Sequence, residues 1–240
     1  MIPGNSKATS AVLVAAGSSS RMGGGLGRKP FLVLEGRTVL EHACDAFDRS
    51  PSVVEIVVVG CADDLGRIRE LAATSPSMRK VGRIVAGGET RAESVGAGVG
   101  AADPALALIA VHDAARPLVQ PGLVERVIAV AAVRGAALVA IPATDTIKTS
   151  SDGERSESTL DRSVLWSAQT PQVFRAELLR ELLERAARDG YRPTDDAALH
   201  ETYVGPVPIV PGDPTNLKLT RPEDLVLAAA VLRERARGTP

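Results

Sequence analysis

The chain has 240 residues, and its 28 lysines and arginines nearly balance its 29 aspartates and glutamates, which gives a formal charge of −1. Because a near-neutral chain offers no broad positive surface and only 2% of its residues are aromatic, non-specific nucleic-acid binding is excluded as a leading function. The 45% hydrophobic content excludes wholesale disorder, and no apolar run reaches the roughly 20 residues of a membrane-spanning helix. The composition predicts a soluble globular protein.

The N-terminal segment MIPGNSKATS has one basic residue followed by turn formers, which is not typical of a cleaved signal peptide. A cytoplasmic location is therefore expected. The spacing between Cys44 and Cys61 matches neither a CxxC motif nor a zinc site. Since both lie in apolar segments, we expect reduced, buried thiols.

Short, continuous apolar runs recur along the first part of the chain, at 11–16, 53–59, 83–86, 106–111 and 136–141. Runs without polar alternation are typical of strands that are buried on both faces of a parallel sheet. Helical patterns lie between them, at about 38–49, 63–73, 90–101 and 121–133. This alternation predicts an α/β fold with a doubly wound, mostly parallel, Rossmann-like sheet.

The pattern changes after Pro142. Residues 143–164 are mostly polar and carry a turn signal at Ser151-Asp152-Gly153, so we expect a β-hairpin arm that leaves the sheet. A long hairpin with little core of its own is marginally stable, so this arm is expected to pack on a second copy of the chain in a homodimer. The predicted organisation is one domain over residues 1–240, with 143–164 as a protruding dimerisation arm.

The C-terminal part predicts helices at about 175–188 and 222–236, with a strand region punctuated by Pro and Gly at 203–218. The last helix is opened by Pro222 and two acidic residues, which favour a helix N-terminus. Trp166 lies where the chain re-enters the sheet, and core packing is expected for it.

The strongest chemical signal follows the first predicted strand, where small residues from Gly17 to Gly27 surround Arg21 and precede Lys29. Small residues let backbone N–H groups approach phosphate oxygens, and the two cations can neutralise charge there. The letters match neither a Walker A motif nor a GxGxxG motif. A phosphate-binding loop of another type is therefore favoured over a flexible linker.

Two further clusters follow predicted strands. GGETRAES, residues 87–94, is either a ligand-binding turn or an ordinary strand-to-helix turn with acidic residues. VHDAARP, residues 111–117, puts Asp113 where an open α/β sheet holds its ligand or metal, and Arg116 could take a phosphate. A surface ion pair between Asp113 and Arg116 is the alternative.

A series of motifs resembles the 2-C-methyl-D-erythritol 4-phosphate cytidylyltransferases, within the wider sugar-nucleotide pyrophosphorylase group. These motifs are AAGSSSRM with a following KP, GGETRAESV, VHDAARP, TDTIK, LDR with WSAQTPQVF, PTDDAAL and NLKLTRPEDL, in the expected order from about residue 11 to 232. The resemblance implies CMP transfer from CTP to methylerythritol phosphate, giving CDP-methylerythritol and pyrophosphate in the non-mevalonate route to isoprenoid precursors. It also implies Mg²⁺ as the cofactor.

The resemblance assigns roles to individual positions. Arg21 and Lys29 would stabilise the charge that develops on the triphosphate, while Lys218 and Arg162 would orient the attacking phosphate. Cytosine and ribose would be held by Ala15, Ala16, Gly17, Gly88, Glu89 and Ser94. Asp113 would lie near the magnesium ion and the substrate, with Ala114 and Arg116 beside it. Further substrate contacts would come from Thr170 and Thr194 and, across the dimer, from Thr146 and Arg162 of the arm.

The chemistry agrees with this set of residues. A phosphomonoester is mostly a dianion at neutral pH and is already a nucleophile, so no general base is required. The reaction needs two anions aligned, and charge stabilised on the α-phosphate and the leaving pyrophosphate. We therefore expect His112 to be a hydrogen-bonded structural residue. A cytidylyltransferase for another polyol phosphate, such as ribitol 5-phosphate, and a non-catalytic nucleotide-binding sensor are the alternatives.

Overall fold

A computed structural model describes residues 7–17 and 27–238, and its centre is a seven-stranded sheet with the order β11-β7-β10-β6-β1-β4-β5. Its strands are β1 (Thr9–Val14), β4 (Val53–Gly60), β5 (Val81–Ala86), β6 (Leu108–Asp113), β7 (Ala136–Pro142), β10 (Trp166–Arg175) and β11 (Ile209–Pro211). Strand β10 pairs antiparallel with both of its neighbours, and the other pairs of the sheet are parallel. The mostly parallel α/β sheet is therefore confirmed.

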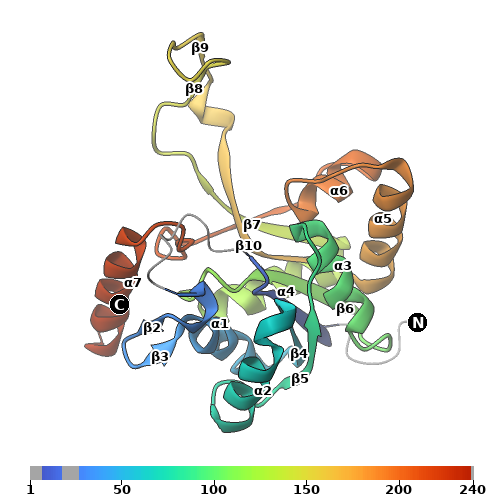
Figure 1. Cartoon of the computed structure of the whole chain (residues 1–240). Coiled ribbons are helices and arrows are strands. Elements are labelled where there is room, and N and C mark those ends of the chain that lie inside the picture. Colours follow the sequence, from blue (N-terminus) through green and yellow to red (C-terminus); the bar gives the residue numbers. More distant parts are fainter. Residues whose placement is uncertain (1–6, 18–26, 239–240) are drawn as a thin grey trace.

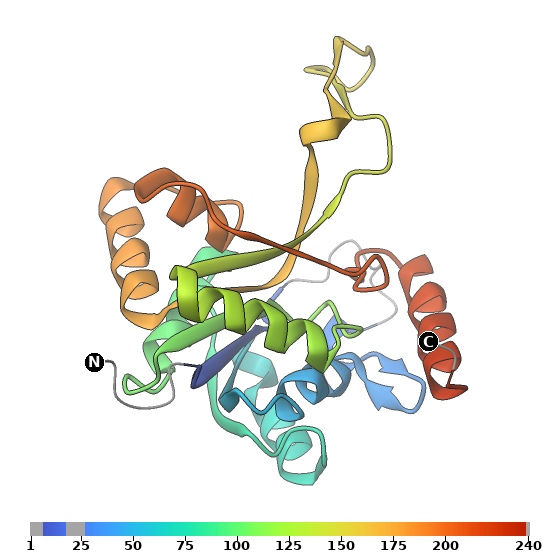
Figure 2. The same cartoon turned by 180° about the vertical axis from the view of Figure 1, so that it is seen from behind.

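Helices cover both faces of this sheet (Figures 1 and 2). One face packs against α1 (Val39–Asp48), α2 (Leu65–Thr74) and α4 (Pro121–Arg134). The other packs against α3 (Arg91–Ala101), α5 (Ala176–Asp189) and α6 (Asp196–Tyr203). Helix α7 (Glu223–Ala236) packs on a smaller cluster next to the short hairpin of β2 (Val33–Leu34) and β3 (Arg37–Thr38). The doubly wound arrangement predicted from the apolar runs is thus present.

The apolar runs form strands because they have no polar side. In β4 every residue from Ile56 to Val59 is 0% exposed, and successive side chains enter the cores on opposite faces of the sheet. The helices between them begin at capping boxes in two cases, at Thr38 for α1 and at Thr90 for α3. The helix limits predicted from the sequence agree with the observed limits to within about two residues, which is the precision at which helix ends are defined.

The order of the strands creates a switch point between β1 and β6. From β1 the chain proceeds outward through β4 and β5, and it then returns to the other side of β1 as β6. The chain leaves β1 toward β4 and leaves β6 toward β7, in opposite directions across the sheet, so the carboxyl ends of these two strands are the place where such a sheet binds ligands. The segments that end at Val14 and Asp113 meet at that edge, where Ala114 N–H donates to the carbonyl of Val14.

The predicted arm is a hairpin that projects away from the sheet, as Figures 1 and 2 both show. Its tip is formed by β8 (Lys148–Thr149) and β9 (Ser158–Thr159), and Gly153 has a positive φ of 75° in the turn between them. The core position expected for Trp166 is wrong, because its side chain is 44% exposed. Trp166 pairs with Pro142 at the base of the arm, before β10 reaches the buried part of the sheet.

The strand region expected at 203–218 is also wrong in extent. Strand β11 covers only Ile209–Pro211, and the segment before it ends the short helix α6, which the sequence pattern did not predict. Asp195 caps α6 by accepting a hydrogen bond from the N–H of Ala198. Across the described residues, no helix combines the length and apolar character that crossing a membrane requires.

Candidate functional site

A cavity of about 370 Å³ opens at the carboxyl edge of the sheet, next to the switch point. Its volume lies in the range of small-molecule sites. Its walls are Val14–Gly17, Lys29, Pro30, Val39, Gly88–Arg91, Ser94, Asp113–Ala115 and Lys218. We call it the carboxyl-edge cavity.

Most of the residues expected to form the site line this cavity. They are Ala15, Ala16, Gly17, Lys29, Gly88, Glu89, Ser94, Asp113, Ala114 and Lys218. The other expected residues do not line it: Arg116 and Thr170 lie near Asp113, Thr194 is on the exposed segment before α6, and Thr146 and Arg162 are exposed on the arm. Arg21 lies outside the described residues.

One wall of the cavity is the turn between β5 and α3. The hydroxyl of Ser94 accepts a hydrogen bond from the N–H of Gly88 and donates to the carbonyl of Thr90. A Cβ on Gly87 would lie 2.6 Å from the Cβ of Ala16, so this wall and the segment after β1 approach each other too closely for a side chain there. The capping box of Thr90 and Glu93 then fixes the start of α3.

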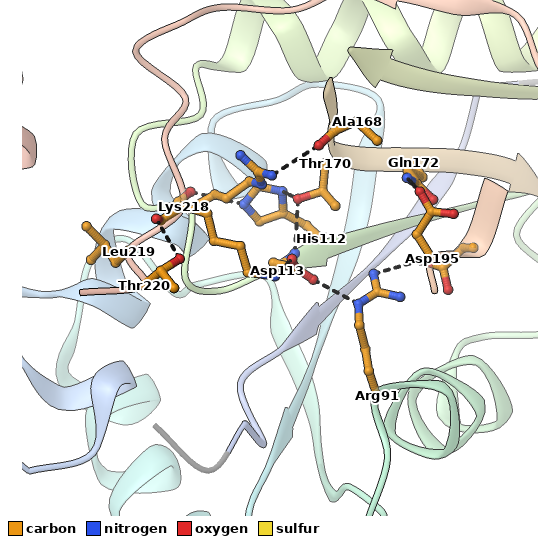
Figure 3. A network of polar contacts seen from close by, with 12 residues as sticks. Arg91, His112, Asp113, Ala168, Thr170, Gln172, Asp195, Lys218, Leu219 and Thr220 are labelled. Atoms are coloured by element: carbon orange, nitrogen blue, oxygen red, sulfur yellow. Dashed lines mark hydrogen bonds and ion pairs between the residues drawn. The ribbon is translucent and has the colours of Figure 1, made fainter. Parts of the chain in front are cut away.

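Asp113 is the centre of the polar network at the cavity (Figure 3). Its Oδ1 accepts from Nε of Arg91 at 3.1 Å, and its Oδ2 accepts from Nζ of Lys218 at 2.7 Å. Burial disfavours the charged carboxylate, but the positive charges of Arg91 and Lys218 outweigh it and hold the pKa of Asp113 well below its usual range. The carboxylate is therefore ionised and orients two cations at the end of β6.

His112 lies beneath this network and is 0% exposed. Its Nε2 is 3.1 Å from the carbonyl oxygen of Arg116, which can only accept, so Nε2 carries the proton. Burial lowers the pKa of His112 to about 4, so the ring is neutral and Nδ1 accepts from the hydroxyl of Thr170 at 2.9 Å. The same hydroxyl accepts from the N–H of Asp113 at 3.1 Å. His112 and Thr170 thus support the backbone of Asp113, as the structural interpretation of His112 predicted.

Two of the five lysines of the chain meet at the cavity. Nζ of Lys29 donates to the carbonyl of Leu219 at 2.7 Å, and the neighbouring residue Lys218 bonds to Asp113. The segment after β11 therefore connects the C-terminal part of the chain to the loop that follows β1. This brings two ammonium groups to one side of the cavity, where they can bind phosphate oxygens.

Arg116 is a partly buried cation that donates hydrogen bonds to main-chain carbonyls. Its Nη1 donates to the carbonyl of Asn216 at 2.8 Å and its Nη2 to that of Ala168 at 3.2 Å, while its Nε is buried without a hydrogen bond. Burial lowers the pKa of Arg116. The sequence left open a surface ion pair between Arg116 and Asp113. Among the described residues, Asp113 pairs instead with Arg91 and Lys218.

The described residues contain no cluster of three or more His, Cys, Asp or Glu side chains that could hold a metal ion. Asp113 is the acidic side chain at the centre of the cavity network. A magnesium ion in a nucleotide site is commonly held by one or two carboxylates, with the remaining ligands from substrate phosphates and water. The Asp113 carboxylate, at the end of β6 in this cavity, therefore fits a magnesium ion that arrives with a triphosphate.

The sequence interpretation missed two residues of this network, Arg91 and Asp196. Arg91 lines the cavity and donates to both Asp113 and Asp196, and the side chain of Asp196 is 2% exposed. Both residues stand inside recognisable motifs, GGETRAES and PTDDAAL. The signal was therefore present, but nothing in local spacing indicates that residues so far apart in sequence meet.

Comparisons with known proteins agree with this geometry. The family model described as 2-C-methyl-D-erythritol 4-phosphate cytidylyltransferase matches residues 9–234. Proteins of that name from Solibacter usitatus and Symbiobacterium thermophilum are 41% and 44% identical to the chain. These alignments cover 94% and 95% of this chain, and 96% and 94% of the relatives.

Solved structures lead to the same group. The crystal structure of 4-diphosphocytidyl-2C-methyl-D-erythritol synthase from Anaerococcus prevotii superposes with a TM-score of 0.83 at 31% identity, covering 95% of this chain and 97% of that one. The family match extends over all the strands and helices that surround the carboxyl-edge cavity. The chain belongs to the 2-C-methyl-D-erythritol 4-phosphate cytidylyltransferase family.

Proposed function

We propose that the protein transfers CMP from CTP to 2-C-methyl-D-erythritol 4-phosphate, which yields CDP-methylerythritol and pyrophosphate for isoprenoid precursors. Family membership over residues 9–234 supports this reaction. The observation that carries it to this chain is the carboxyl-edge cavity, where Lys29, Asp113 and Lys218 converge at the switch point of the sheet.

CTP is proposed to occupy the carboxyl-edge cavity. The turn of Gly88, Glu89 and Ser94 would hold cytosine and ribose, because it offers main-chain groups and one hydroxyl at the cavity wall. The main chain at Ala15–Gly17, on the facing wall, would hold cytosine and ribose together with this turn, and Lys29 would meet the triphosphate. Arg21, outside the described residues, is proposed to add its charge to that of Lys29.

The attacking group is the substrate phosphate, a dianion that needs no base. Arg116, whose guanidinium donates to the carbonyls of Asn216 and Ala168, is suited to bind such an anion. Lys218, whose Nζ lies 2.7 Å from Asp113, is proposed to orient the attacking phosphate. Thr170 is proposed to act by supporting this region, since its hydroxyl proton is committed to His112. Thr194 is the further proposed contact for the substrate, on the segment before α6.

A magnesium ion would be held by Asp113 together with oxygens of the triphosphate. When bound, it would neutralise charge on the phosphates, including the leaving pyrophosphate. The protein's own contribution is positional: the N–H of Asp113 is held by Thr170, and its carboxylate is held by Arg91 and Lys218. These contacts preorganise the charged groups before the reactants arrive.

We also propose that the active form is a homodimer in which the arm of each chain completes the site of the other. Thr146 and Arg162, the proposed substrate contacts of the arm, are exposed, and Nη1 of Arg162 donates to the carbonyl of Thr144. Apolar side chains near them are also exposed, with Val164 at 71% and Trp166 at 44%. Covering such a surface with a second copy gives a physical reason for dimerisation.

A pyrophosphate-release assay tests this function. Purified protein is given Mg²⁺ and each of the four nucleoside triphosphates, with methylerythritol phosphate, ribitol 5-phosphate or no acceptor. The proposal predicts release only with CTP and methylerythritol phosphate together. Faster turnover of ribitol 5-phosphate would identify another polyol phosphate cytidylyltransferase, and CTP binding without release would identify a nucleotide sensor.

A further inference from the structure

Arg91, the first residue of α3, connects two parts of the molecule that are distant in sequence. Its Nε donates to Oδ1 of Asp113 at the end of β6, and its Nη2 donates to Oδ2 of Asp196 at 2.8 Å. In Figure 3 the Arg91 side chain rises from α3 and lies between Asp113 and the segment that carries Asp195. One planar guanidinium therefore bridges the centre of the cavity and the start of α6.

The α3 end of this bridge is rigid. Arg91 follows Thr90, whose side chain and that of Glu93 form the capping box of α3. The carbonyl of Thr90 also accepts from the hydroxyl of Ser94, which itself accepts from Gly88. The turn that forms a wall of the carboxyl-edge cavity thus also fixes the position of the Arg91 backbone.

The α6 end is fixed by a second strand. Gln172 of β10 is 1% exposed, and its amide donates to Asp195 at 2.8 Å and accepts from the N–H of Ala197 at 2.8 Å. The start of α6, just after Thr194, is therefore attached to β10 by Gln172 and to α3 by Arg91. Without the second attachment, this end of α6 would be joined to the cavity network only indirectly.

The charges around Arg91 indicate what it does. Its guanidinium faces two carboxylates at hydrogen-bond distance, Asp113 at 3.1 Å and Asp196 at 2.8 Å. A guanidinium that is already neutralised by two carboxylates is a poor additional cation for a triphosphate. Lys218 shares only Asp113 with Arg91 and is 42% exposed, so it is better placed to meet an incoming phosphate.

We propose that Arg91 is a positioning residue for the transfer reaction: it holds the Asp113 carboxylate and, through Asp196, ties the nucleotide side of the site to the Thr194 segment on the acceptor side. The proposal rests on the proposed function, because it describes how that site is aligned. Arg91 touches neither reactant in it and acts through Asp113 and Asp196. Its planar fork is essential, since a lysine could reach one carboxylate but could not bridge both.

The test uses Arg91→Lys and Asp196→Asn, with Arg79→Lys and Asp48→Asn as matched controls. Arg79 also pairs at 2.8 Å with a buried carboxylate, Asp48, which is 1% exposed, but its own side chain is 71% exposed and it lies near the start of β5, away from the cavity. Steady-state kcat and both KM values are measured per folded enzyme, together with CTP affinity by calorimetry and the melting temperature.

We expect Arg91→Lys to lower kcat by about 10–100-fold, the loss typical of removing a group that orients a reacting residue. Asp196→Asn should leave Asp113 paired and raise KM for methylerythritol phosphate by roughly tenfold, with a smaller change for CTP. In the double variant the fold-decrease in kcat/KM for methylerythritol phosphate should be well below the product of the two single fold-decreases, because both substitutions break the same bridge. The controls should lower the melting temperature and leave the kinetic constants unchanged.

The proposal is overturned if Arg91→Lys and Asp196→Asn resemble the controls, with kcat and both KM values within about twofold of wild type. It is also overturned if Arg91→Lys weakens CTP binding as much as it slows turnover, because Arg91 would then contact the triphosphate itself. A wild-type protein that binds CTP but transfers nothing would instead refute the proposed function.

Discussion

The buried imidazole of His112 makes the stability of the protein depend on pH in a calculable way. The ring is 0% exposed, packs 4.9 Å from the Phe47 ring between centroids, and is held by Thr170 and the carbonyl of Arg116. Because burial lowers its pKa from 6.5 to about 4, the folded protein keeps the ring neutral where the unfolded chain protonates it. Protons therefore favour the unfolded state as the pH falls below 6.5.

The size of the effect follows from proton linkage. The free energy of unfolding that the neutral His112 contributes is fully present above pH 6.5 and is lost as the pH falls toward 4. Below pH 4 the ring is protonated in both states, so the loss does not increase further. Between pH 7 and pH 5 this amounts to about 2 kcal/mol of unfolding free energy. The substitution His112→Gln removes the titrating group, while its amide retains one donor and one acceptor for the two partners.

Urea unfolding of both proteins at pH 7 and pH 5 measures this directly. The other titrating groups change the unfolding free energy equally in both proteins. The drop in unfolding free energy from pH 7 to pH 5 is therefore compared between the wild type and His112→Gln. We expect the wild type to lose about 2 kcal/mol more than His112→Gln between these pH values. Equal losses would refute the assignment of a neutral, buried His112.

Three further results are expected. Lys29→Ala should lower kcat by about 10²–10³-fold and CTP affinity much less, because the charge that Lys29 meets grows in the transition state; equal losses would contradict this role. Mixing inactive Lys29→Ala and Arg162→Ala proteins should restore about a quarter of wild-type activity through mixed dimers with one intact site, whereas no recovery would exclude an arm that acts across the dimer. A thiol reagent should modify the partly exposed Cys61 in the folded protein and reach Cys44 only on unfolding, since burial raises the pKa of Cys44; simultaneous labelling of both would contradict the structure.

The sequence predicted the parallel part of the sheet well because each buried strand is a continuous apolar run. Strand β10 is different: its first half extends from the arm, and its buried half contains Gln169 and Gln172, which are 4% and 1% exposed. Polar residues that are buried and satisfied by distant partners look like loop residues in a sequence pattern. Trp166 was expected in the core because it is aromatic, and the sequence pattern does not show that the first part of β10 is exposed at the base of the arm.

The cavity was predictable in so far as its residues follow strands or stand in motifs. Asp113 and the Gly88 turn could be located because parallel strands end at one edge of a sheet. The position of Lys218 beside Asp113 and the bridge from Arg91 to Asp196 depend on contacts across about a hundred residues, which local periodicity cannot reveal. Helix α6 was missed because its eight residues are too few to show a clear apolar period.

A transfer experiment with CTP labelled at the α-phosphorus tests the central claim most directly. Wild-type protein, Mg²⁺ and methylerythritol phosphate are incubated with the labelled nucleotide, and the labelled product and pyrophosphate are quantified together. The account predicts that the label moves into CDP-methylerythritol with one pyrophosphate released for each transfer. Label recovered as CMP, or unchanged CTP with no pyrophosphate, would contradict it.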